Sequence, residues 1–328
     1  MKKFLSRRLD TTRDLVMCLM MNGIHMRHHL PPGSRGLFEQ YIADCAALTP
    51  QQFYAVPSAD ITSSNGGATL HWASPVRTEF VENNVTHVDL YPCAKGWGAP
   101  TVFMLHALMS VSDEGYKRWA QRFNEQGWNA CFIHLPYHYS RVPHGYFNGE
   151  LAIGPDLVRT GEGLRQGVVE LRQLMVYLRS LGCPGFGLWA TSYGGWIGAL
   201  LTFVERDFRF IALMSPIVNV RHAIWKSPAA IWVRRELRRN GITPEMVAQH
   251  SHLTSPMHSA PLCGGDHAIL TTGLHDITSR PEDVEELHKS WPGSELRLIP
   301  QGHYGYRIMP DMLKRLIERG LFAGEGGK

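Results

Sequence analysis

The stretch 186–195 constrains the fold most strongly, because an apolar segment runs there into a serine flanked by small residues. The first five residues predict a buried strand, and residues 196–201 begin an apolar helix. Ala190 and Gly194 stand two positions before and two positions after Ser192. We expect small residues there because a sharp strand-to-helix bend presses these two positions together. The sequence therefore predicts one serine hydroxyl held clear of a sheet, at the N-terminus of a helix.

Strand-like and helix-like segments alternate on both sides of this turn. Apolar runs predict further strands at 101–105, 129–134, 210–214, 268–276 and 295–299. Helical periodicity is clearest at about 162–181 and again at about 310–321. Earlier in the chain, residues 69–72, 78–81 and 85–91 predict antiparallel strands at the sheet edge. This order predicts an α/β fold with a mostly parallel sheet and helices on both faces.

The chain divides into an N-terminal extension and one large domain. Its 328 residues, 44% of them hydrophobic, can bury a large core. Residues 68–328 form the predicted domain, with an insertion at about 219–266 that we interpret as a cap containing two helices. Residues 1–67 are an extension with short helical patches. Its role stays open between a dimer arm, a second lid and a brace across the sheet.

Composition and charge exclude several classes of partner. The net charge of +4 is too small to indicate a nucleic-acid partner, and we interpret the basic run 234–239 as a solvated helix face. The apolar run 15–21 is too short to span a bilayer, and no signal-peptide cleavage site follows it. Six scattered cysteines without a Cys-x-x-Cys pair favour free thiols in a reducing compartment. We therefore expect a cytoplasmic protein without an integral membrane segment.

Three polar residues follow the ends of predicted parallel strands. Ser192, Asp276 and His303 each come just past a C-terminal strand end. In an open α/β sheet these ends share one crevice, so the three side chains are expected to meet. Two other aspartates compete with Asp276, but Asp266 precedes its strand and Asp283 falls within the next predicted helix.

With these features the chain resembles the α/β-hydrolase superfamily of serine hydrolases, whose nucleophile, acid and base follow one another in this order. The resemblance covers about residues 68–321. Its markers are the serine turn, the His106 loop, the turn before Asp276 and the Gly302-His303 turn. It implies that Ser192 is the nucleophile, His303 the general base and Asp276 the acid that orients the imidazole.

The resemblance also implies an oxyanion hole and substrate contacts. The N–H groups of Tyr193 and Leu108 are the expected oxyanion donors, and His106 and Trp196 are the expected substrate-binding side chains. Alanine replaces the usual glycine at two places, Ala107 and Ala190, so the shapes of both turns depart from the family pattern.

The implied activity is hydrolysis of a small-molecule carboxylic ester, thioester or lactone through an acyl-enzyme. A peptidase or amidase of the same fold and a catalytically silent binding protein remain alternatives. A metal-dependent hydrolase would need the histidine clusters at 25, 28 and 29 or at 134, 138 and 144, which lack a ligand pattern, so no metal is expected. No dinucleotide or phosphate loop is present, so no cofactor is expected. The sequence leaves the oligomeric state open, a homo-oligomer included.

Overall fold

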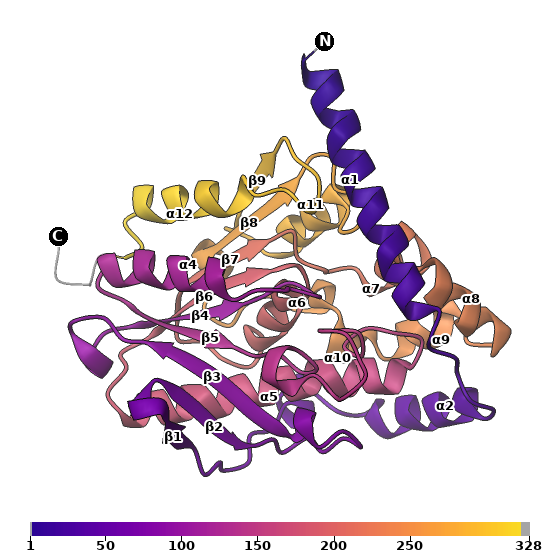
Figure 1. Ribbon diagram of the computed structural model, residues 1–328, viewed down its shortest axis with the longest axis horizontal. Coiled ribbons are helices and arrows are strands. Elements are labelled where there is room, and N and C mark those ends of the chain that lie inside the picture. The colour runs from indigo at the N-terminus through magenta and orange to yellow at the C-terminus, as the bar shows by residue number, and fades with distance from the viewer. Residues whose placement is uncertain (1, 323–328) are drawn as a thin grey trace.

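A computed structural model describes residues 2–322, with side chains from residue 7 onward. Across these residues nine strands form one sheet in the order β1-β2-β3-β5-β4-β6-β7-β8-β9 (Figure 1). The strands are β1 (Thr62–Ser64), β2 (Thr69–Ala73), β3 (Val85–Tyr91), β4 (Thr101–Leu105), β5 (Asn129–Ile133), β6 (Phe186–Thr191), β7 (Phe208–Met214), β8 (Ala268–Gly273) and β9 (Glu295–Ile299).

The sheet is mixed but mostly parallel. β1, β2, β3 and β5 pair antiparallel in succession, whereas the pairs from β5 through β4, β6, β7 and β8 to β9 are all parallel. β6 lies inside the parallel part, between β4 and β7. The predicted α/β fold with a mostly parallel sheet is confirmed, and the end of β6 opens into the crevice that the parallel strand ends share.

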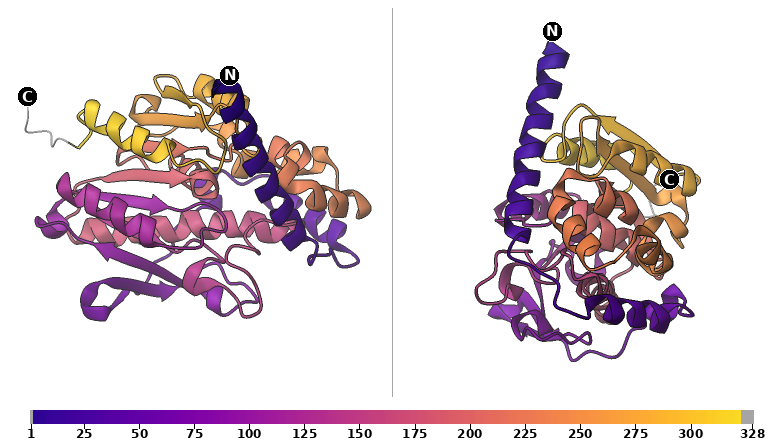
Figure 2. Two further views of the ribbon diagram at one scale, coloured as in Figure 1. Left: turned by 45° about the horizontal axis from the view of Figure 1, so that its top comes forward. Right: turned by 90° about the vertical axis from the view of Figure 1, so that its right-hand side faces the viewer.

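Helices cover both faces of the sheet (Figures 1 and 2). They are α1 (Lys2–His25), α2 (Ser34–Cys45), α3 (Pro50–Phe53), α4 (Glu114–Glu125), α5 (Leu157–Ser180), α6 (Ser192–Leu201), α7 (Val220–Trp225), α8 (Ile231–Arg239), α9 (Pro244–Gln249), α10 (Ser251–Thr254), α11 (Pro281–Ser290) and α12 (Ile308–Glu318). No helix within residues 2–322 is long and apolar enough to cross a membrane.

Alternation along the buried strands separates the core into two layers. In β4, Val102 and Met104 pack with α4 and α12 on one face, whereas Phe103 and Leu105 pack with α5 and α6 on the other. Both sets are completely buried. This two-sided burial explains why the central strands read as continuous apolar runs in the sequence.

Residues 78–81 do not form the strand that the sequence predicts. The Asn84 side chain accepts hydrogen bonds from the Thr78 N–H at 2.7 Å and from its hydroxyl at 3.1 Å. The segment is therefore a loop closed by its own side chains, because such local bonds compete with the sheet ladder. The edge strand that pairs with β2 is instead β1, from within the N-terminal 67 residues.

Residues 215–267, between β7 and β8, are helical and contain α7, α8, α9 and α10, twice the number of helices expected there. The N-terminal helix α1 packs against this insertion, at α8 and at a short 3₁₀ helix, η5 (Pro228–Ala230). Figure 2 shows α1 running along this side of the molecule, with its first turns projecting beyond the body. α1 thus lies over the edge of the sheet where the parallel strands end.

Candidate active site

Ser192 lies at the turn between β6 and α6. It is the first residue of α6 and has a φ of 51°, in the left-handed region that side-chain-bearing residues adopt only at a cost. This single residue redirects the chain from strand to helix. It also places the hydroxyl at the helix N-terminus, where backbone N–H groups have no partner within the helix.

Glycine is required at position 194 because the backbone there lies close to the end of β4, and not close to Ala190 as expected. A methyl group there would lie 2.6 Å from the carbonyl oxygens of Leu105 and His106, at the end of β4. The Gly194 N–H donates to the His106 carbonyl at 3.0 Å. The small residue after Ser192 therefore lets α6 pack against the end of β4, rather than against Ala190 as the sequence suggested.

Ser192, His303 and Asp276 are brought together as one hydrogen-bonded chain. Ser192 Oγ lies 2.9 Å from His303 Nε2, and His303 Nδ1 lies 2.7 Å from Asp276 Oδ2. With the proton on Nδ1, the ring donates to the carboxylate and Nε2 is free to accept from the Ser192 hydroxyl. Ser192 follows β6 as the first residue of α6, and Asp276 and His303 come from the loops that follow β8 and β9, all at one end of the sheet.

The second oxygen of Asp276 is held by backbone groups. Asp276 Oδ1 accepts hydrogen bonds from the N–H groups of Thr278 and Ser279, both at 2.8 Å. These bonds fix the orientation of the carboxylate towards His303. The competing aspartates lie elsewhere: Asp266 precedes β8, and Asp283 lies in α11 beside His222 Nδ1 at 2.5 Å.

The electrostatics favour a proton on His303. Burial alone would lower the pKa of His303, but the nearby Asp276 carboxylate and its hydrogen bond outweigh burial and raise it overall, with a smaller contribution from Asp14. An imidazole that gains a proton easily beside a serine hydroxyl has the electrostatic character of a general base.

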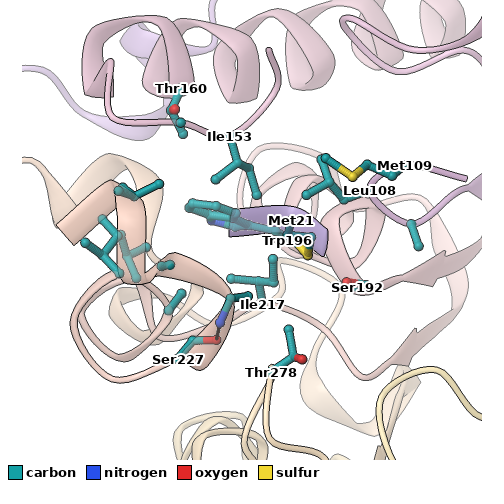
Figure 3. Close-up of a pocket in the computed structure, with 18 of the residues that line it drawn as sticks. Met21, Leu108, Met109, Ile153, Thr160, Ser192, Trp196, Ile217, Ser227 and Thr278 are labelled. Atoms are coloured by element: carbon teal, nitrogen blue, oxygen red, sulfur yellow. Dashed lines mark hydrogen bonds between the residues drawn. The ribbon is translucent and has the colours of Figure 1, made fainter. Parts of the chain in front are cut away.

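The loop after β4 places Leu108 at the cavity and turns the His106 side chain away from it. Leu108 lines the cavity beside Ser192 (Figure 3). The His106 side chain is completely buried outside that lining: its Nε2 accepts from the Leu135 N–H at 3.2 Å, and its Nδ1 lies 2.9 Å from the Ala107 carbonyl. The expected substrate contact of His106 is therefore replaced by a structural one, because both ring nitrogens face the backbone and shape the loop.

Tyr193 and Trp196 occupy the first turns of α6. The Tyr193 backbone N–H belongs to the first turn of the helix, beside the hydroxyl of Ser192, while its side chain is completely buried and stacks on His138 at 5.6 Å between ring centroids. Trp196 lines the cavity, and its Nε1–H donates to the Thr254 carbonyl at 2.6 Å. Trp196 is thus fixed as a wall of the cavity next to Ser192.

The cavity at Ser192 has a volume of about 470 Å³ and a mostly apolar lining. Figure 3 shows Trp196 and Ile217 between Ser192 and Ser227 of the helical insertion, while Leu108 and Met109 lie on the same side of the cavity as Ser192. The apolar lining comes mainly from Met17, Met21, Phe38, Leu108, Met109, Ile153, Leu157, Leu164, Trp196, Ile217, Val220, Ile224, Val233 and Val247. Such a site suits a largely apolar ligand.

The N-terminal helix contributes site residues that the sequence analysis missed. Met17, Met21 and His25 of α1 line the cavity, and Asp14 accepts a hydrogen bond from the His303 N–H at 2.7 Å. No local sequence signal identifies these residues, because the sequence of an N-terminal helix does not indicate which distant loop it packs against.

The histidine clusters do not assemble into a metal site. Within the part of the chain that the structure describes, no three His, Cys, Asp or Glu side chains are grouped so that they could hold a metal ion. His28 contacts Glu150 at 2.8 Å, and His134 contacts Asp89 at 3.2 Å and Ser140 at 2.8 Å. All six cysteines are free thiols.

Comparisons of the sequence alone find little similarity to known proteins. No family model matches the chain. A segment of 87 residues is 26% identical to the Uncharacterized protein YdjC of Bacillus subtilis (strain 168), covering 26% of this chain and 75% of that protein.

Solved structures match over most of the chain. An acetyl xylan esterase from Paenibacillus sp. R4 is 15% identical with a TM-score of 0.59, covering 86% of this chain and 94% of its own. Acetyl xylan esterase 1 from Thermoanaerobacterium sp. JW/SL YS485 is 13% identical with a TM-score of 0.61 over 90% and 95%. The acylaminoacyl peptidase of Pyrococcus horikoshii is 15% identical with a TM-score of 0.54, over 84% of this chain and 44% of its own. From the sheet order and these neighbours, the chain has the α/β-hydrolase fold.

Proposed function

We propose that this protein is a serine hydrolase that cleaves a carboxylic ester through an acyl-enzyme intermediate. The observation that carries the proposal is the continuous hydrogen-bonded chain from Ser192 through His303 to Asp276, at the end of the cavity that could hold the substrate. A serine hydroxyl is a weak nucleophile by itself, and an adjacent base held by a third group activates it. Thioesters and lactones react by the same steps.

In the proposed mechanism Ser192 Oγ attacks the substrate carbonyl carbon while His303 Nε2 takes the hydroxyl proton. The tetrahedral intermediate collapses, and His303 returns that proton to the leaving alcohol. Water then attacks the acyl-enzyme with His303 again as the base, which releases the acid and restores Ser192. The Asp276 carboxylate orients His303 and stabilises the imidazolium that forms in each half of the reaction.

The N–H groups of Tyr193 and Leu108 are the proposed oxyanion donors. Tyr193 supports this role because its N–H lies in the first turn of α6, where the helix dipole also favours negative charge. Leu108 supports it because its loop follows β4, is anchored by the His106 ring and borders the cavity beside Ser192. Donors fixed in this way need no rearrangement when the charge develops.

The cavity favours an ester with an apolar acyl chain. The fold neighbours include proteins named acetyl xylan esterases, but acetyl groups are small and xylan is polar. Here Trp196, Ile217 and residues of α1, α5 and the helical insertion enclose about 470 Å³ of mostly apolar space. Each methylene buried there contributes about 0.8 kcal/mol, equivalent to roughly fourfold in kcat/KM.

The nucleophile is tested by labelling with a fluorophosphonate probe and peptide mapping by mass spectrometry. We expect one adduct on Ser192 that is lost in Ser192→Ala and in His303→Ala. Ser227→Ala is the matched control, because Ser227 lines the same cavity but its hydroxyl accepts from the Ala229 N–H. Absence of an adduct on folded wild-type protein would refute the proposed chemistry and favour a silent binding protein.

Substrate class is tested by a series of p-nitrophenyl esters from acetyl to dodecanoyl. We expect kcat/KM to rise with each added methylene until the cavity is filled and then to fall. Ile217→Trp should move the optimum to shorter chains, because it fills the space between Ser192 and the helical insertion. A preference for acetyl esters would contradict the apolar acyl assignment while leaving the serine mechanism intact, and preferential cleavage of matched anilides would indicate an amidase.

A further inference from the structure

The loop that carries His303 is bonded to a carboxylate from the other end of the chain. Asp14, in the middle of α1, is completely buried. Its Oδ2 accepts from the His303 N–H at 2.7 Å, and its Oδ1 accepts from the Tyr304 N–H at 3.3 Å. Both bonds are to backbone groups, so they hold the path of the loop while leaving the imidazole free to face Ser192 and Asp276.

Gly302 completes the cradle for Asp14. A methyl group at Gly302 would lie 2.6 Å from both carboxylate oxygens of Asp14, well inside van der Waals contact. The backbone φ of Gly302 is not in the left-handed region, so its conformation does not itself demand glycine. The space that glycine leaves is occupied by the Asp14 carboxylate.

Neighbouring residues of α1 bind the same loops and the helical insertion. Asp10 contacts His275 Nδ1 at 2.9 Å, next to Asp276 in the chain. Asn22 donates to the Pro228 carbonyl and accepts from the Trp232 N–H, both at 2.8 Å. α1 therefore contacts the loop after β8 that carries Asp276 (the acid loop), the loop after β9 that carries His303 (the base loop) and the helical insertion (Figures 1 and 2).

We infer that Asp14 is a positioning residue for His303, and that α1 therefore helps to hold the active site in its catalytic arrangement. The inference rests on the proposed function, in which His303 is the base. Asp14 touches no reacting atom. It holds the base loop so that His303 Nε2 remains within 2.9 Å of Ser192 Oγ, and small displacements of a base from its nucleophile reduce the rate strongly.

Asp14 affects His303 through its charge as well as through its hydrogen bonds. The titratable groups that surround this contact are Asp276 from the acid loop, Cys18 from α1 and Tyr304 from the base loop. Burial raises the pKa of the Cys18 thiol and of the Tyr304 hydroxyl, so both stay uncharged near neutral pH. The carboxylates of Asp276 and Asp14 both raise the pKa of His303, while burial raises the pKa of Asp14 itself and its hydrogen bonds from the His303 and Tyr304 N–H groups oppose that rise.

The primary test compares Asp14→Asn with Asp10→Asn. Both remove one carboxylate charge from the same helix, but Asp10 contacts the His275 ring and not the base loop. For Asp14→Asn we expect a fall in kcat of roughly 10- to 100-fold with little change in KM. We also expect the acid limb of the pH–rate profile to move to lower pH. Equal effects of the two substitutions would overturn the inference.

A double-mutant cycle with Gly302→Ala separates positioning from general damage. Gly302→Ala alone should reproduce the loss of activity, because its methyl group displaces the Asp14 carboxylate. In the Asp14→Ala background the same change should have little further effect, because the smaller side chain leaves room for the methyl group. Additive losses would overturn the inference, since Gly302 would then be needed for a reason other than Asp14.

A readout independent of activity distinguishes this inference from the proposed function. The Nδ1 proton of His303 can be followed by NMR as the pH is varied. We expect His303 to titrate at lower pH in Asp14→Asn than in wild type and in Asp10→Asn. This result would support the Asp14 assignment even if Ser192 reacted with no probe. An unchanged titration in Asp14→Asn would overturn the assignment even if Ser192 were labelled.

Discussion

His250 makes the stability of this protein sensitive to acid. It joins α9 to α10, is only 5% exposed, and packs edge-on against the rings of Tyr41 and Phe53, at 4.9 and 5.7 Å between centroids. Among the described residues, neither ring nitrogen has a hydrogen-bond partner. Burial, reinforced by the neighbouring His252, lowers the pKa of His250 to about 4.

The sign and size of the effect follow from proton linkage. An unfolded histidine has a pKa near 6.5, so the unfolded chain takes up the proton first as the pH falls. Protonation then favours unfolding until about pH 4, where the folded form is protonated too. Between pH 7 and pH 5 one such group costs about 1.8 kcal/mol of unfolding free energy.

Other buried histidines add to this loss, among them His106, whose pKa burial lowers well below its ordinary value. The pKa values of His25 and His138 are also lowered to about 4, in both cases mainly by burial. Together His25, His138 and His250 lower the unfolding free energy by about 5 kcal/mol between pH 7 and pH 5, which is a large part of the total stability of an ordinary domain. His303 acts in the opposite direction, because its pKa is raised and its protonation stabilises the folded state as the pH falls.

The test is urea unfolding of wild type and His250→Phe at pH 7 and pH 5. Phenylalanine fits among the same rings and cannot take up a proton, so the variant should lose about 1.8 kcal/mol less than wild type over this interval. At pH 7 its stability should equal or exceed that of wild type, since no hydrogen bond is lost. His144→Gln, at an exposed position, is the control. A pH dependence identical to that of wild type would refute the reasoning.

Three further predictions concern packing and protonation. The buried carboxylate of Glu170 lies 2.6 and 2.8 Å from the Arg141 guanidinium, and Arg141→Met leaves it without this partner. The substitution should lower the unfolding free energy, measured with urea, by about 3–5 kcal/mol. A loss under about 1 kcal/mol would contradict the argument. Gly194→Ala pushes a methyl group against the end of β4 and should cost about 1–3 kcal/mol and suppress labelling, whereas Gly115→Ala, in open space on α4, should change neither. The raised pKa of His303 predicts that hydrolysis falls as the pH drops through a value above 6.5, so an acid limb entirely below pH 6 would contradict the raised pKa of this base.

The central sheet was predictable because each buried parallel strand leaves a strong local signal. β4, β5 and β6 are apolar along most of their length, and each ends at a sharp change to polar or small residues. Chain order and the rule that parallel strand ends share a crevice were then sufficient to expect Ser192, Asp276 and His303 close together. The distances among the three side chains needed the structure.

Side-chain direction within loops was not predictable. The sequence places His106 in the loop next to Ser192, and so suggested contact with substrate, but the ring turns inward to bond the Leu135 N–H. The same limit applies to residues 78–81, where the Asn84 side chain decides between loop and strand. In both cases one specific hydrogen bond overrides a pattern that only reports average polarity.

Asp14 and His303, which are 289 positions apart in the chain, are in contact. Their separation shows why the role of the N-terminal extension could not be inferred from the sequence. Ser192 and Asp276 follow β6 and β8, which have hydrogen-bonded neighbours on both sides. His303 follows β9, which within residues 2–322 is an edge strand paired with β8 alone and is partly exposed along its length. An edge strand restrains its loop less than a central strand does. The base loop therefore needs a restraint from outside the sheet, and α1 supplies it through Asp14 while its methionines close the cavity over Ser192.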